Sequence, residues 1–189
     1  MVNKRTSEYK INKLILNRHS PRAMSGEKIE DKQLFSLFEA ARFAPSAYNN
    51  QPWKFLYAKR NTPNWDLFFN HLVDFNKSWV KNASALVILI SNKAPGGYAS
   101  PTNQFDAGAA WENLALEASN QKLVAHGMIG FDFAKVRETL NIPEDYDILA
   151  MIAIGKPGKK SELTKELRQK EVISDRKKLS EIIVEGKFK

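Results

Sequence analysis

The sequence predicts an α+β fold in which long helices surround a modest sheet. Three short runs, residues 53–59, 84–91 and 148–154, have the length and the apolar or alternating pattern of strands. Two longer segments, residues 28–43 and 106–123, repeat apolar residues at helical spacing. These elements do not alternate regularly along the chain, as they would in a doubly wound parallel sheet.

The first part of the chain is expected to be mainly helical. Residues 8–17 place apolar side chains on one helical face. Pro21 prevents a helix from running through the polar and basic residues that follow. The helix predicted over residues 28–43 ends at Ala44-Pro45, because the residue before a proline disfavours helical backbone.

The middle of the chain contains the most apolar elements. Residues 53–59 alternate and are interpreted as a strand, and the aromatic-rich stretch 64–82 as an amphipathic helix whose aromatic residues belong to the core. Residues 84–91 are the clearest buried strand, because they are apolar almost throughout. The helix over residues 106–123 is rich in alanine and contains little charge, which is typical of a helix packed on several sides.

The last third of the chain begins with a turn at residues 128–132. This turn leads into a helix over 132–140, for which Asp132 is the expected N-cap. A second buried strand follows at 148–154. Beyond it the chain becomes charged and retains one apolar patch, at residues 182–184.

The composition is that of a folded, non-membrane protein. Hydrophobic residues make up 43% and charged residues 26% of the 189 residues, so we expect a single domain over residues 1–189 and not a disordered chain. The lack of cysteine excludes disulfides, thiolate metal sites and cysteine nucleophiles, and it fits a reducing compartment such as the cytoplasm. The unbroken apolar runs, such as residues 85–90, are far too short to span a bilayer.

The net charge of +8 is unevenly distributed. Residues 156–189 contain eleven basic and six acidic side chains. Such an excess suits a nucleic acid or a small phosphate-bearing ligand, and the chain contains no recognised nucleic-acid-binding motif. The three histidines lack the spacing of metal ligands, and no phosphate-binding loop is present. If the protein is an enzyme, we therefore expect a bound cofactor to perform the chemistry.

Two segments are candidates for binding such a cofactor. In Arg18-His-Ser-Pro-Arg22, two guanidinium groups and a hydroxyl suit a phosphate and polar ring edges. The alternative is a solvated helix end. In residues 44–53, two prolines favour extended backbone, and Ser46, Asn49, Asn50 and Gln51 supply the donors and acceptors that a heteroaromatic ring edge requires. The alternative is a capped turn between helix and strand.

These segments resemble the nitroreductase family of FMN-dependent oxidoreductases. The resemblance extends over nearly all of residues 8–188, and the segment APSAYNNQPW matches the family signature A-P-S-x-x-N-x-Q-P-W without a mismatch. It implies a central, mostly antiparallel sheet surrounded by helices, with a C-terminal extension that crosses to the partner subunit. Five segments follow the family order: RHSPR at 18–22, APSAYNNQPW at 44–53, the alanine-rich helix from Asp106, MIGFD at 128–132 with AMIAIGKPG at 150–158, and DRKKLSEIIVEG at 175–186.

The resemblance implies a phosphate side of the FMN site. Arg18, His19, Ser20 and Arg22 are expected to hold the phosphate, the ribityl chain and the pyrimidine edge of the flavin. Arg176 is expected to add a second phosphate contact, which gives the basic C-terminal residues a purpose.

It also implies a ring side. Met128, Ile129 and Gly130 are expected to lie over the isoalloxazine and to offer a backbone N–H to flavin N5, and Asn76 resembles a family asparagine at the pyrimidine side. The family binds its flavin in a dimer interface. By the same resemblance, Pro45, Ser46 and Asn49 would reach the flavin of the other subunit, with Gln51 supporting their loop.

The function that follows is hydride transfer from NADH or NADPH through FMN to a small oxidant such as a nitroaromatic or a quinone. No side chain is assigned as a catalytic acid and no metal is expected, and His126 is interpreted as a structural hydrogen-bonding residue. The expected assembly is a homodimer that binds neither nucleic acid nor membrane. Two alternatives remain: a specialised flavoprotein without general NAD(P)H reductase activity, and a basic nucleic-acid-binding module.

Overall fold

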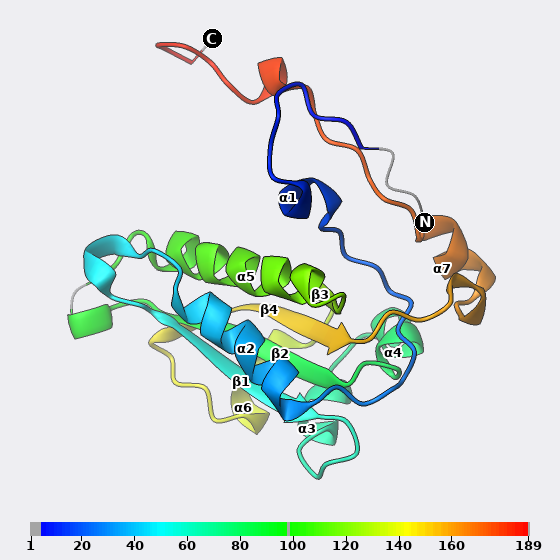
Figure 1. Ribbon diagram of the computed structural model, residues 1–189. Helices are drawn as coiled ribbons and strands as arrows, with labels where there is room; N and C mark the ends of the chain where they lie inside the picture. The colour runs from blue at the N-terminus through cyan, green and yellow to red at the C-terminus, as the bar shows by residue number, and fades with distance from the viewer. Residues whose placement is uncertain (1–4, 98, 189) are drawn as a thin grey trace.

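The computed structural model describes residues 5–97 and 99–188, which form a four-stranded antiparallel sheet with helices on both faces (Figure 1). The strands lie in the order β1 (Trp53–Lys59), β2 (Ala85–Asn92), β4 (Tyr146–Gly155) and β3 (Val124–Met128). The α+β prediction is confirmed, and β1, β2 and β4 form where the apolar runs predicted them.

The two central strands carry the buried runs. All residues of β2 except Asn92 are buried, and β4 pairs with it so that Val87 lies opposite Ile152. Strand β3 was not predicted, because its five residues V-A-H-G-M have no clear pattern of their own. It forms at a sheet edge by pairing with β4, where His126 lies opposite Ala153.

One face of the sheet is covered by α2 (Asp31–Arg42) and α5 (Asn103–Asn120) (Figure 1). Alternate strand residues point to this face, because side chains alternate along a strand. Helix α5 has contacts with α2, with α1 and with strands of the sheet, and its small side chains allow a close approach. Its buried residues are Asn103, Asp106, Ala107, Ala110, Leu114, Ala115 and Ala118.

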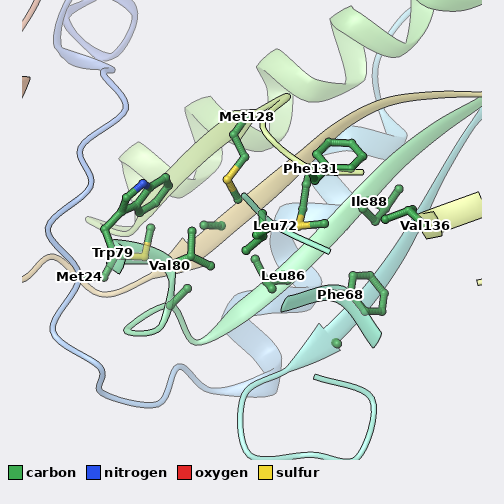
Figure 2. Packing of buried hydrophobic residues seen from close by; sticks show 14 of the residues in the cluster. Met24, Phe68, Leu72, Trp79, Val80, Leu86, Ile88, Met128, Phe131 and Val136 are labelled. Atoms are coloured by element: carbon green, nitrogen blue, oxygen red, sulfur yellow. The ribbon is translucent and has the colours of Figure 1, made fainter. Parts of the chain in front are cut away.

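The other face is covered by α3 (Asp66–Phe69), α4 (Asp74–Val80) and α6 (Phe133–Thr139). Figure 2 shows Trp79 of α4 and Phe68 of α3 among the buried side chains of this cluster. Both residues were expected in the core, and they are 2% and 4% exposed.

The single helix predicted over residues 64–82 is wrong, because the chain forms two short helices with a break before Val73. Val73 has extended backbone, with φ −64° and ψ 151°. Its N–H donates to Gly130 O at 3.0 Å, and the adjoining Leu72 forms a bridge with Phe131. These long-range hydrogen bonds replace helical ones, so the tertiary structure overrides the amphipathic pattern.

The turn at residues 128–132 and the helix after it are confirmed. Helix α6 follows the turn directly, and Asp132 caps it by accepting a hydrogen bond from Lys135 N at 3.0 Å. The N-terminal helix is shorter than predicted, because α1 comprises only Lys13–Asn17. It begins after Asn12, whose side chain accepts from Leu14 N, and the apolar residues before Asn12 are exposed, so no packing extends the helix.

The chain after β4 runs along the outside of the fold (Figure 1). It contains η3 (Lys160–Glu162), α7 (Lys165–Lys170) and η4 (Leu179–Glu181), and two further 3₁₀ turns, η1 (Ala47–Asn49) and η2 (Pro95–Gly97), lie in earlier loops. The C-terminal segment lies beside the N-terminal one, where Leu179 N donates to Glu8 Oε1 at 2.8 Å. The apolar patch at residues 182–184 is exposed. Within the described ranges, no helix combines the length and apolar character needed to cross a membrane.

Candidate functional site

The basic segment follows α1 and lies against α5. Arg18 Nε lies 3.5 Å from Oε1 of Glu112 on α5, and Arg18 Nη1 donates to Ser20 Oγ at 3.3 Å. The Arg18 side chain is only 15% exposed. The guanidinium group is therefore held in place by the fold, unlike the solvated helix end that was the alternative interpretation of this segment.

His19 lies apart from these two side chains. With Pro21 and Ala23 it lines a pocket of about 410 Å³, to which Arg18 and Ser20 do not contribute. Successive side chains of an extended segment point to opposite sides, which explains the separation. His19 Nδ1 lies 3.0 Å from Asn17 O, and a contact between His19 and the ligand of Arg18 stays a prediction.

Arg22 is held through its backbone by a buried carboxylate. The N–H groups of Arg22 and Ala23 both donate to Oε1 of Glu171, at 2.8 and 2.9 Å, and Glu171 is 3% exposed. Among the described residues, Nε of Arg22 is buried and has no hydrogen-bond partner. A buried donor without a partner costs about 1–3 kcal/mol, so this guanidinium group is suited to an acceptor from a ligand. Glu171 was missed because it lies far along the chain from the residues it holds.

A buried histidine connects this segment to β3. Nδ1 of His126 lies 3.0 Å from Pro21 O, and since a carbonyl oxygen only accepts, Nδ1 carries the proton. Burial lowers the pKa of His126 below its usual 6.5; the bond to Pro21 opposes this shift, and the charge of Arg22 adds to it. His126 is therefore neutral at pH 7 and acts as a structural hydrogen-bond donor, as the sequence predicted.

The turn after β3 lies next to α4. Met128 is buried and Ile129 is 74% exposed, so the turn presents Ile129 at the surface. Gly130 O accepts hydrogen bonds from Val73 N and from Asn76 Nδ2, both at 3.0 Å. A Cβ atom on Gly130 would lie 2.5 Å from Asn76 Nδ2, so a larger residue here would displace the Asn76 amide.

Asn76 uses both ends of its amide inside the protein. Nδ2 donates to Gly130 O, and Oδ1 accepts from Trp79 Nε1 at 3.3 Å. The residue is 7% exposed. Asn76 therefore supports the turn after β3, and its expected contact with a pyrimidine edge stays a prediction.

The loop at residues 44–52 is strained and largely exposed. Tyr48, Asn49 and Gln51 have φ of 51°, 57° and 47°, in the left-handed region that asparagine tolerates but that is unfavourable for Tyr48 and Gln51. The extended backbone expected here is therefore wrong for the middle of the loop. Ser46 Oγ accepts from Gln51 N at 3.0 Å, and Gln51 Nε2 donates to Asn49 O at 3.0 Å, whereas Pro45 is exposed. Such strain persists only where the surroundings determine the backbone, and it is typical of functional loops.

Asp106 anchors this loop to the start of α5. The residue is 3% exposed, and its Oδ2 accepts from Ala47 N and from Thr102 Oγ1, both at 3.2 Å. Arg18 lies further along the same helix, at Glu112. Among the described residues, the loop and the basic segment therefore contact α5 at different points along the helix, at Asp106 and at Glu112.

Three guanidinium groups gather where the two terminal segments meet α1. Arg5 Nε donates to Ser174 O at 2.7 Å, and its Nη1 donates to Arg18 O at 2.8 Å. Burial lowers the pKa of Arg5, and the charges of Arg176 and Arg18 lower it further. Arg176 is exposed and donates to Asp175 O at 3.0 Å. This concentration of positive charge fits a phosphate group. Arg5 was missed because a lone arginine before the first helix forms no pattern.

These groups are suited to binding an anionic ligand. Permanent positive charge lies where the N-terminal and C-terminal segments meet, hydrogen-bonding groups follow the basic segment, and the turn that contains Gly130 lies at the edge of the sheet. In residues 5–97 and 99–188, no three His, Asp or Glu side chains come together in a way that would hold a metal ion.

Comparison with known proteins gives consistent matches. The model of the Nitroreductase family matches residues 15–156. The crystal structure of an oxidoreductase containing FMN superposes with a TM-score of 0.95 at 40% sequence identity, over 100% of this chain and 98% of that one. A protein from Desulfovibrio desulfuricans, described as a nitroreductase and solved in complex with FMN, has a TM-score of 0.75 and 25% identity over 94% of this chain and 96% of its own. The oxygen-insensitive NADPH nitroreductase of Helicobacter acinonychis is 28% identical, in an alignment that covers 79% of this chain and 89% of that protein.

Proposed function

This chain belongs to the nitroreductase family, and from that premise we propose that it binds FMN and transfers electrons from NADH or NADPH to a small oxidant. The observation that carries the proposal is that Arg5 binds both Arg18 O and Ser174, which Arg176 also contacts, while buried Nε of Arg22 lacks a partner among the described residues. FMN has a phosphate at one end and a polar ring edge at the other, which these groups suit. The FMN-containing relatives at 40% and 25% identity support the assignment.

Different residues would contact the phosphate, the ribityl chain and the ring of FMN. Arg18 and Arg176, with His19 and Ser20, would hold the phosphate and the ribityl chain. Arg22 would approach the pyrimidine edge, where its permanent charge favours negative charge on the ring. Met128, Ile129 and Gly130 would form the backbone surface under the ring, braced by Asn76.

Hydride transfer from a nicotinamide, and its delivery to a nitroaromatic or a quinone, is the chemistry that FMN supplies when bound. The chain's own residues bind and orient the reactants. No side chain is assigned as a catalytic acid or base. The relative from Helicobacter acinonychis is named for NADPH, which supports a nicotinamide donor and leaves NADH and NADPH as alternatives for this chain.

A homodimer is part of the proposal. The loop that carries Pro45, Ser46 and Asn49 is exposed or half-exposed, and Asp106 anchors it at the start of α5. The C-terminal segment exposes the apolar residues 182–184, which need an apolar surface to cover them. Two copies would satisfy both features if the loop and the C-terminal extension of one reached the other.

The first experiment is a visible absorption spectrum of the protein with added FMN, followed by anaerobic addition of NADH or NADPH. We expect a bound flavin that bleaches, and the faster donor identifies the preferred nucleotide. A bound flavin that neither nucleotide bleaches would favour the specialised flavoprotein. A protein that retains no flavin at low salt would contradict the proposal and would favour nucleic acid as the partner of the basic residues.

A substitution tests the phosphate side separately. Arg18→Ala should weaken FMN binding by about 2–3 kcal/mol, because it removes a charged hydrogen bond to phosphate. Arg42→Ala is the matched control, since Arg42 is exposed and pairs with Glu39 at the end of α2. Equal affinity of the two variants would remove Arg18 from the site.

A further inference from the structure

A continuous row of contacts crosses the core from the basic segment to the turn after β3. Pro21 O accepts from His126 Nδ1 at 3.0 Å. The ring of His126 packs against the indole of Trp79, with 4.7 Å between centroids and 47° between planes. Trp79 Nε1 donates to Asn76 Oδ1 at 3.3 Å, and Asn76 Nδ2 donates to Gly130 O at 3.0 Å. The two segments that would contact opposite parts of a flavin are thus joined through side chains and backbone groups in direct contact.

The chemistry of the donors sets the orientation of each group in this row. An indole nitrogen only donates, so the oxygen of the Asn76 amide has to face Trp79. The NH₂ end then faces Gly130 O, which is the arrangement observed. At the other end, the carbonyl of Pro21 requires the proton on Nδ1 of His126. Trp79 Nε1 therefore fixes which end of the Asn76 amide faces the turn.

The row has little room to relax. Trp79, Asn76 and His126 are 2%, 7% and 9% exposed. A methyl group on Gly130 would already overlap the Asn76 amide, so the turn and α4 are in close contact. In a close-packed interior, a displacement at one member is transmitted to its neighbours.

We propose that Trp79 and His126 are positioning residues of the flavin site, which hold the Arg22 segment and the turn after β3 at a set separation. Trp79 also fixes the amide of Asn76, and through it the carbonyl of Gly130. The inference rests on the proposed function, because the two segments matter together only if one ligand contacts both. A tryptophan that served only to fill the core would need its ring and not its N–H group.

The test compares Trp79→Phe with Trp65→Phe in the full chain loaded with FMN. Phenylalanine at position 79 keeps an aromatic ring against His126 and removes the N–H group. Trp65 packs against the same apolar cluster, stacked on Phe69 at 5.7 Å, and controls for the loss of ring volume. We expect the Kd of FMN to rise about tenfold in Trp79→Phe, the effect of one buried hydrogen bond, with an altered visible circular dichroism spectrum of the flavin. Trp65→Phe should keep the wild-type Kd and spectrum.

A second pair of variants tests the histidine. His126→Leu removes the donor to Pro21 O and should weaken FMN binding. His126→Asn retains a donor nitrogen close to the position of Nδ1 and should restore most of the affinity. Equal affinities of the Leu and Asn variants would mean that the hydrogen bond has no part in positioning.

A measurement without flavin checks the geometry directly. Val73 N donates to Gly130 O, so its amide hydrogen should exchange faster in apo Trp79→Phe than in apo Trp65→Phe. Wild-type affinity, spectrum and exchange in Trp79→Phe would overturn the inference and leave Trp79 as a core residue. If the wild-type protein itself does not bind FMN, the proposed function fails first and this inference fails with it.

Discussion

Replacing Gly130 with alanine is the most direct perturbation of the turn after β3. The added Cβ would lie 2.5 Å from Asn76 Nδ2 and 3.1 Å from Val73 Cγ2. The φ of Gly130 does not lie in the left-handed region, so the backbone itself accepts alanine and only the contacts oppose it. Val73 and Asn76 cannot move freely, because both donate hydrogen bonds to the carbonyl of Gly130.

The expected cost follows from two effects. Forcing a methyl group into a close-packed contact typically costs about 1–3 kcal/mol. Displacing the Asn76 amide breaks its bond to Gly130 O and leaves a buried donor without a partner, which costs about 1–3 kcal/mol. Because one movement produces both effects, they overlap, and we expect Gly130→Ala to lower the free energy of unfolding by about 2–4 kcal/mol.

The assay is urea unfolding of the apoprotein followed by circular dichroism, with Gly108→Ala as the control. Gly108 is exposed in α5, and a Cβ added there would have no atom within 4 Å among its non-local neighbours, so alanine should stabilise the helix by about 0.5–1 kcal/mol. The two Gly→Ala changes should therefore have opposite signs. A stability of Gly130→Ala within about 0.5 kcal/mol of wild type would refute the close packing of the turn against α4.

Three further predictions concern the supports of the site. Asp106→Ala removes the acceptor of Ala47 N, so it should lower the free energy of unfolding by about 1–3 kcal/mol and speed hydrogen exchange at the Ala47 amide. Unchanged exchange at Ala47 would contradict the anchoring role. Burial lowers the pKa of His126, so the histidine takes up a proton in the unfolded chain before it does so in the folded one as the pH falls below 6.5. The contribution of His126 should therefore lower the free energy of unfolding by up to about 1.4 kcal/mol per pH unit in that range. Urea unfolding between pH 7 and pH 5 should show a smaller decrease in His126→Asn, and equal slopes would exclude the histidine as the cause. Gly158→Ala should be costlier than Gly130→Ala in the same unfolding assay, since its Cβ would lie 2.5 Å from the backbone carbon of Met24, which cannot rotate away; a stability equal to wild type would contradict this contact.

The pattern of neighbouring residues was sufficient to predict the central strands and the long helices. The run at residues 84–91 predicted β2 because every neighbour of a central strand is protein, which leaves an almost uninterrupted apolar sequence. The alanine-rich segment predicted α5 because its small side chains allow it to pack on several sides. Asp132 marked the start of α6 because a capping side chain acts on backbone only three residues away.

The errors occur where distant parts of the chain compete with local preference. Residues 64–82 have a helical pattern, but Val73 bonds to Gly130 and interrupts the helix. Strand β3 exists because β4 offers it a partner. The segments that resemble the nitroreductase family include the residues expected to contact FMN, but their order in the sequence did not reveal that Glu171 holds Arg22, or that Arg5 lies beside Arg18 and Arg176.

The sequence by itself determined the fold class and the family and predicted the segments of the candidate site, because apolar periodicity and short motifs are properties of neighbouring residues. Only the tertiary structure decided how those segments are held. The carboxylate of Glu171, the indole of Trp79 and the carboxylate of Asp106 each bind a backbone or side-chain group that the fold brings to them. Hydrogen bonds depend on distance and direction in space, and chain folding sets both without leaving a periodic trace in the sequence.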